Sequence, residues 1–168
     1  MKILFISLGC DKNLVDTEEM LELLRKKGYS FTDDENECDI VVVNTCCFIG
    51  DAKEESINAL LEAAELKKSG RVKVLAAAGC LAQRYCREIQ TEIPEVDAIM
   101  GTTCIGRIAD ALEQALSGGR PVFVQEPDAP LEYRIDRVLT TGGHYAYLKI
   151  AEGCNKRCSY CVIPQIRG

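Results

Sequence analysis

Short apolar runs alternate with amphipathic stretches through residues 1–120 of the chain. The run Asp39–Thr45 contains four consecutive β-branched residues, which is typical of a parallel strand that is buried on both faces. Similar runs predict strands at Lys2–Leu8, Val72–Ala78 and Val96–Met100. Because these runs are separated by helical patterns, we expect an α/β fold with a parallel, doubly wound sheet and helices on its faces.

Helical periodicity fills the segments between these strands. Asp16, with Glu19 three residues later, resembles a helix N-cap and its capping box, and Gly28 is a suitable residue to end that helix. Further helices are predicted at Asp51–Ser69, through the repeat Leu81, Tyr85 and Ile89, and through the stripe from Ile105 to Leu116.

The pattern changes after residue 120. Residues 121–144 contain proline and glycine without periodicity, which predicts a linker, and the only histidine, His144, is expected to be solvated there. Tyr145–Ala151 predicts a new strand that leads into a cysteine-rich loop. The predicted organisation is therefore an α/β domain at 1–120, a linker at 121–144, and the beginning of a second domain at 145–168.

Composition narrows the possible partners. The formal net charge is -6, so nucleic-acid binding is not expected of this segment, because such binding depends on basic patches. No apolar run approaches the ~20 residues that span a bilayer. The first ten residues faintly resemble a lipoprotein signal, but we expect a buried strand there and a cytoplasmic protein.

Three of the ten cysteines lie close together in the sequence: Cys154, Cys158 and Cys161, in a C-x3-C-x2-C arrangement. In a cytosolic chain, so many cysteines indicate metal or redox chemistry rather than disulfide bonds. Three thiolates can hold three irons of a four-iron cluster and leave the fourth iron open to an external ligand. Structural zinc usually takes four protein ligands, so zinc fits this loop less well.

A second set of cysteines is dispersed in the sequence. Cys10, Cys46 and Cys80 each follow a predicted strand, and parallel strands present their carboxyl ends at one edge of the sheet, where such folds bind ligands. The alternative is that they are buried as small apolar residues. That packing role is the preferred interpretation for Cys38, Cys86 and Cys104, while Cys47 remains an alternative thiol beside Cys46.

Four segments together resemble the radical S-adenosylmethionine (SAM) methylthiotransferases: Ser7–Asp16, Asn44–Cys46, Gly79–Tyr85 and Glu152–Gly168. The first of them is most similar to the branch that modifies an aspartate of a small-subunit ribosomal protein. Asp11 stands where this family usually has proline, and Cys47 where it usually has glycine.

The resemblance implies a flavodoxin-like domain followed by the first strand and cluster loop of a radical-SAM β/α barrel. It implies two 4Fe–4S clusters, one on Cys154, Cys158 and Cys161, with Tyr160 near the adenine of SAM. Cys10, Cys46 and Cys80 would hold an auxiliary cluster that carries the transferred sulfur; the roles of Asn13 and Asp16 are left open. A SAM-derived radical would take hydrogen from the β-carbon of the aspartate, which then collects the methylthio group.

The implied partners are a small-subunit ribosomal protein and an electron donor of the flavodoxin or ferredoxin type, and the 168-residue segment alone is expected to be inactive. Two alternatives remain open. One is a methylthiotransferase that acts on a tRNA adenosine. The other is a non-catalytic iron–sulfur or zinc-binding module.

Overall fold

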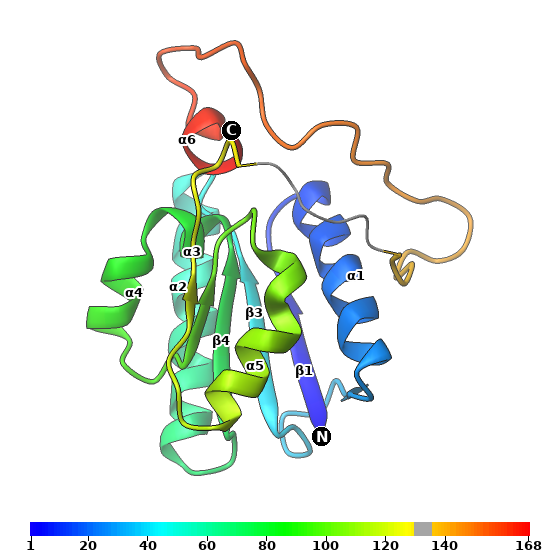
Figure 1. Ribbon diagram of the computed structural model, residues 1–168, viewed down its shortest axis with the longest axis vertical. Coiled ribbons are helices and arrows are strands. Elements are labelled where there is room, and N and C mark those ends of the chain that lie inside the picture. Colours follow the sequence, from blue (N-terminus) through cyan, green and yellow to red (C-terminus); the bar gives the residue numbers. More distant parts are fainter. Residues whose placement is uncertain (130–135) are drawn as a thin grey trace.

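A six-stranded parallel sheet forms the core of the computed structural model, which describes residues 1–129 and 136–168 (Figure 1). The strand order is β2-β1-β3-β4-β5-β6, and every neighbouring pair is parallel. The strands are β1 (Lys2–Ser7), β2 (Ser30–Phe31), β3 (Ile40–Thr45), β4 (Val74–Gly79), β5 (Ala98–Met100) and β6 (Val122–Phe123). This arrangement confirms the predicted α/β fold.

The central strands are the most deeply buried. Every residue of β3 and β4 is buried, and for β3 this burial on both faces was predicted from its unbroken apolar run. The edge strands β2 and β6 contain two residues each and were not predicted, because a run of two residues has no detectable period.

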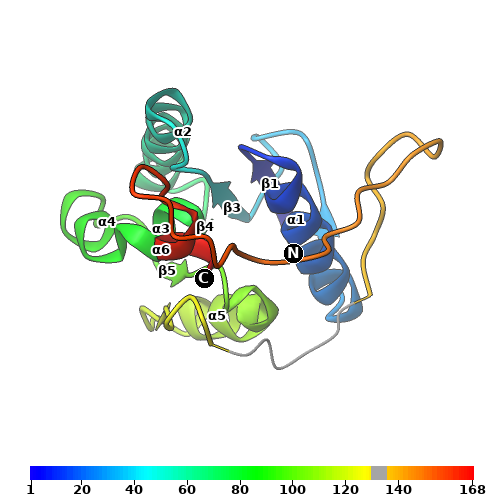
Figure 2. The ribbon, with the colours of Figure 1, turned by 90° about the horizontal axis from the view of Figure 1, so that it is seen from above.

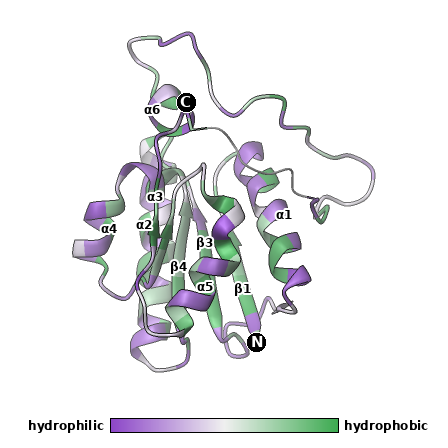
Figure 3. Ribbon diagram, in the orientation of Figure 1, coloured by the Kyte–Doolittle hydropathy of each residue, from purple (hydrophilic) through white to green (hydrophobic). Residues whose placement is uncertain are grey.

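Helices cover both faces of the sheet (Figure 2). One face packs against α1 (Asp11–Lys26) and α5 (Ile108–Leu116), which follows a short 3₁₀ turn, η1 (Ile105–Arg107). The other face packs against α2 (Gly50–Lys68), α3 (Cys80–Arg84) and α4 (Cys86–Glu92). The apolar residues of the strands therefore lie between two helical layers (Figure 3). None of the described helices has the length and apolar character needed to cross a membrane.

The prediction that Asp16 caps a helix is wrong. Helix α1 begins at Asp11, because the chain turns at Gly9 (φ 92°) and enters the helix at once, with Cys10 at the N-cap position. Asp16 therefore lies inside the helix and is fully buried. The predicted end is confirmed, since Gly28 (φ 86°) follows α1 and its N–H donates to the carbonyl of Arg25 at 3.0 Å.

The predicted continuous helix through Leu81, Tyr85 and Ile89 is interrupted. Tyr85 has φ −123° and ψ 33°, which separates α3 from α4. Nevertheless, all three side chains pack against the same apolar cluster, which explains the regular spacing in the sequence.

The strand predicted at Tyr145–Ala151 is not formed. No strand of the described chain lies beside this segment, so its backbone has no ladder to join, and Leu148 and Ile150 are 82% and 89% exposed. The predicted linker contains β6 near its start, and its residues 130–135 lie outside the described part.

The chain ends on the carboxyl edge of the sheet, where α6 (Ile163–Arg167) sits above the strand ends (Figure 1). Ile166 is buried in the same apolar cluster as Leu81. Gly168 lies against residues where the chain first leaves the sheet: a Cβ at this position would be 2.8 Å from the carbonyl oxygen of Pro127.

Candidate functional site

Three cysteine-bearing turns meet at the carboxyl edge of the sheet. Cys10 follows β1, Cys46 follows β3 and Cys80 follows β4, and these three strands are adjacent. The chain leaves β1 toward one side of the sheet and β3 toward the other, and this change of direction is where doubly wound folds bind ligands. The structure thus brings the three turns to the expected edge.

Asn13, in the first turn of α1, connects these turns. Its side-chain amide donates to the carbonyl of Leu8 at 2.8 Å and to that of Thr45 at 2.9 Å. Its side-chain oxygen accepts from the thiol of Cys80 at 3.6 Å. One fully buried amide therefore contacts the segments that carry Cys10, Cys46 and Cys80, a role that the sequence did not reveal.

The turn at Gly9 is packed directly against Cys46. A Cβ at position 9 would lie 2.6 Å from Cβ and 2.7 Å from Sγ of Cys46, closer than real side-chain atoms approach. The backbone N–H of Cys46 donates to the hydroxyl of Ser56 on α2 at 2.8 Å. Position 9 consequently requires glycine, both for its backbone angle and for this close approach.

The three thiols differ in their surroundings. Cys10 is exposed, whereas Cys46 and Cys80 are buried. Burial raises the pKa of the Cys80 thiol to about 11, against the opposing effect of the Arg167 guanidinium. The free thiol is therefore protonated at neutral pH, and binding a metal there would release a proton.

The remaining cysteines of the sheet domain are buried or half-buried. Burial, followed by the proximity of Cys80, raises the pKa of Cys47 to about 12, and this side chain belongs to the apolar cluster under α2. Cys38 and Cys104 are buried as well, and Cys86 is half-buried. All ten cysteines are free, so no disulfide bond competes with metal binding.

The second cysteine set surrounds a separate cavity of about 470 Å³, lined in part by Cys154, Cys158 and Cys161. Between these cysteines the chain reverses tightly: Arg157 has φ 49°, and the N–H of Cys161 donates to the carbonyl of Cys158 at 3.0 Å. The three cysteines line this cavity, and three thiolates would be a suitable donor set for an iron–sulfur cluster with one iron left for an external ligand. Tyr160 is 90% exposed.

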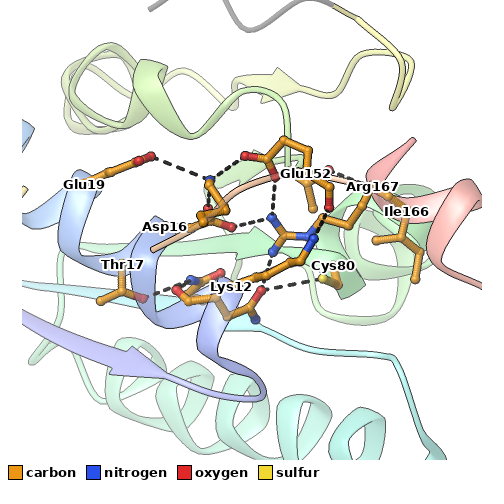
Figure 4. A network of polar contacts seen from close by, with 12 residues as sticks. Lys12, Asp16, Thr17, Glu19, Cys80, Glu152, Ile166 and Arg167 are labelled. Atoms are coloured by element: carbon orange, nitrogen blue, oxygen red, sulfur yellow. Dashed lines mark hydrogen bonds and ion pairs between the residues drawn. The ribbon is translucent and has the colours of Figure 1, made fainter. Parts of the chain in front are cut away.

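A partly buried polar network fixes this loop to the carboxyl edge (Figure 4). The ammonium of Lys12 donates to the carbonyls of Ala151 and Glu152 at 2.7 and 2.6 Å. The hydroxyl of Thr102, in the turn after β5, donates to the carbonyl of Ile166 at 2.7 Å. The N–H of Cys154 donates to the carbonyl of Gly168 at 2.7 Å, which ties the start of the loop to its end.

Asp16 is the acidic centre of the network. Its carboxylate lies 2.6 Å from Lys149 Nζ and 2.6 Å from Arg167 Nη1, and both cations also contact Glu152. Burial alone would lower the pKa of both cations, but the neighbouring carboxylates, Asp16 foremost, outweigh it and raise them. Both cations therefore stay charged in this buried position.

Lys149, Glu152 and Arg167 were missed as site residues by the sequence reasoning. The available signal was weak: Arg167 closes a segment whose other residues include Ile163 and Ile166, and a charged residue among apolar ones marks a buried ion pair. Across the described residues, no three His, Cys, Asp or Glu side chains are close enough together to hold a metal ion. The two cysteine sets and Tyr160 therefore remain predicted ligands and contacts.

A family model described as Uncharacterized protein family UPF0004 matches residues 2–101, more than half of the chain. The chain belongs to the UPF0004 family. The matched residues contain β1 to β5 and with them all three strand-end cysteines, so the UPF0004 region coincides with the part of the fold that forms the first cysteine set.

This UPF0004 chain is also similar to curated proteins named Ribosomal protein uS12 methylthiotransferase RimO. The relative from Lachnoclostridium phytofermentans is 60% identical over the whole chain, which spans 38% of that relative. Relatives from Pelotomaculum thermopropionicum and Symbiobacterium thermophilum are each 50% identical over the whole chain, which spans 38% and 35% of them. These matches confirm the resemblance to methylthiotransferases, and the chain corresponds to less than two fifths of these proteins.

Proposed function

We propose that the full-length protein containing this chain is a methylthiotransferase that modifies an aspartate of ribosomal protein uS12. The observation that carries the proposal is the docking of one three-cysteine loop onto the sheet edge where three further cysteine turns meet. The name of its 60%-identical relative, a uS12 methylthiotransferase, supports the proposed reaction and substrate protein.

Each set supplies three cysteines, which is the number that would bind a four-iron cluster and leave one coordination position free. Cys154, Cys158 and Cys161 would hold the cluster that binds SAM, with Tyr160 near the adenine, and Cys10, Cys46 and Cys80 would hold the auxiliary cluster. When bound, these groups supply one-electron reduction, the transferred sulfur and the radical that an unactivated C–H bond requires.

The residues of the chain then have distinct tasks. Asn13 holds the three turns of the auxiliary set in one arrangement through its contacts with Leu8, Thr45 and Cys80. Cys10 is the exposed member, so the accessible side of this set lies there. Lys12 anchors the backbone just before Cys154, which keeps the two sets on the same edge.

Partners and location follow from this reaction. An electron donor of the flavodoxin or ferredoxin type would reduce the clusters, and the substrate places the enzyme in the cytoplasm. The relatives named for uS12 favour the ribosomal protein over a tRNA adenosine as substrate. The 168-residue chain alone is expected to be inactive, because its Cys154 loop is open and its apolar residues 148 and 150 are uncovered.

Metal analysis tests the cofactor assignment. Anaerobic reconstitution of the full-length protein should give about eight irons per chain with matching sulfide. A variant in which Cys10, Cys46 and Cys80 are replaced by alanine should bind about four irons per chain. A variant in which Cys154, Cys158 and Cys161 are replaced should also bind about four. Cys38→Ala, a buried cysteine outside both sets, is the control and should keep about eight. Zinc without sulfide would contradict the assignment.

Mass spectrometry tests the substrate. Ribosomal protein uS12 from cells lacking the full gene should lose a methylthio group from one aspartate, and the intact gene should restore it. Loss of the group from tRNA, with uS12 unchanged, would instead establish the tRNA alternative.

A further inference from the structure

Arg167 is the most deeply buried cation of the network, with 3% of its surface exposed. Its guanidinium contacts three side chains: Asp16 Oδ2 at 2.6 Å, Glu152 Oε2 at 3.2 Å and Asn13 Oδ1 at 2.5 Å. Arginine suits this position because its planar group donates in several fixed directions at once. The two carboxylates therefore determine where the third contact points.

That third contact leads to the auxiliary cysteine set. Asn13 Oδ1 accepts one hydrogen bond from Arg167 and another from the thiol of Cys80. With its oxygen held in this way, the amide of Asn13 faces the carbonyls of Leu8 and Thr45. Arg167 thus defines which way the Asn13 side chain is turned, although 154 positions separate them.

We propose that Arg167 is a positioning residue of the auxiliary site, where it orients Asn13 and places a permanent positive charge beside Cys80. This inference rests on the proposed function, because it concerns the same cysteine set. It adds that the segment from Cys154 to Gly168 contributes a residue, Arg167, to the auxiliary site in addition to carrying the ligands proposed for the other cluster.

A fixed positive charge beside a sulfur ligand has one measurable consequence. It would stabilise the additional electron of a reduced cluster, which raises the reduction potential. A residue that only held the loop in place would not change the potential once the loop is docked. The potential therefore separates a positioning role from a purely structural one.

Two substitutions of Arg167 separate the effect of its charge from the effect of its shape. Arg167→Lys keeps the charge and loses the planar group of donors, whereas Arg167→Gln removes the charge. Arg71→Gln is the matched control, because Arg71 is exposed and contacts Asn36 near the opposite edge of the sheet. The double variant Asp16→Asn with Arg167→Gln removes one charge of each sign from the network, whereas Arg167→Gln alone leaves an excess negative charge. We therefore expect the double variant to be the less destabilised of the two.

Hydrogen exchange of the metal-free, full-length protein tests the contact itself. In Arg167→Gln, amides of residues 10–20 should exchange about tenfold faster, because Asn13 loses its restraint and Asp16 keeps only one of its two cationic partners, Lys149. The double variant should exchange more slowly than Arg167→Gln, and Arg71→Gln should match the parent protein. Equal exchange in Arg167→Gln and the parent would overturn the proposed contact.

The reduction potential tests the effect on the site. It is measured on protein in which Cys154, Cys158 and Cys161 are alanine, so that only the auxiliary cluster is present. Arg167→Gln should shift the potential to more negative values, and Arg167→Lys should retain it within the range of the Arg71→Gln control. An unchanged potential in Arg167→Gln, or an equal shift in Arg167→Lys, would contradict the role of the charge.

The two measurements also separate this inference from the proposed function. If the parent protein binds no cluster on Cys10, Cys46 and Cys80, the proposed function fails at that site. The exchange comparison needs no cluster, so it still decides whether Arg167 positions Asn13.

Discussion

The side-chain oxygen of Asn13 accepts a hydrogen bond from the thiol of Cys80, with 3.6 Å between the two atoms. This contact joins the first turn of α1 to the end of β4, across the intervening strand β3. The same amide reaches the ends of β1 and β3, so a single side chain controls the spacing of three turns.

Asn13→Ala should destabilise the fold by about 3 kcal/mol, because it leaves the carbonyls of Leu8 and Thr45 without their donor in a buried place. Urea unfolding of the metal-free protein measures this loss. Asn58→Ala is the control: Asn58 is exposed on α2, and alanine favours helix, so the stability should stay within about 0.5 kcal/mol. Equal stability of the two variants would rule out the role given to Asn13.

Gly9→Ala should reduce the free energy of unfolding more than Gly28→Ala, although both glycines have similar positive φ angles, 92° and 86°. At position 28 no atom lies within 4 Å of the added Cβ, so only backbone strain of about 1–2 kcal/mol is expected. At position 9 the Cβ would collide with Cys46, which should bring the loss to about 3 kcal/mol or more. Thermal unfolding of the two variants measures these losses of stability. Equal losses would show that the turn at position 9 accommodates a Cβ without displacing Cys46.

Thr102→Val should lower the free energy of local opening of α6 by about 1–2 kcal/mol. The reason is that the carbonyl of Ile166 loses a buried donor while the side-chain volume is retained. Amide exchange in residues 163–168 should accelerate accordingly. Thr91→Val serves as the comparison, since Thr91 is exposed and bonds only within its own helix. Unchanged exchange in Thr102→Val would mean that other contacts alone hold α6.

Replacing Leu148 and Ile150 by serine should reduce self-association of the isolated 168-residue chain. Both side chains are more than four fifths exposed and lie two positions apart in a segment without regular secondary structure, and exposed apolar side chains favour association with other copies. Light scattering at increasing concentration should show less association for the double variant than for the parent. The opposite order would indicate that association proceeds through another surface.

The sequence was sufficient for features that depend on local patterns. The unbroken run Ile40–Val43 predicted a doubly buried strand, and the alternation of such runs with helical stripes predicted the sheet that brings Cys10 and Cys80 to one edge. These patterns arise because each strand or helix buries its own apolar residues. An element can therefore be predicted from its own sequence, without knowing which distant segments pack against it.

Features that depend on distant partners were not predictable in this way. Asp16 has the local signature of a helix cap, but its carboxylate pairs with Lys149 and Arg167, which are far away in the sequence. Tyr145–Ala151 has a strand pattern, yet a strand requires a neighbour to accept its hydrogen bonds. Asn13 contacts three separate turns, and no pattern in the sequence around it indicates these contacts.

The meeting of Gly168 with Pro127 has an implication for how related sequences can vary. Pro127 and Gly168 are thus held at the same place, so the distance between them does not dictate the number of residues that join them. Doubling such a loop costs only ~0.6 kcal/mol of entropy. Insertions at residues 141–146, which lie beyond the contacts of Val138 and Thr140 with Glu18, should therefore leave the geometry of the cysteine-bearing edge unchanged.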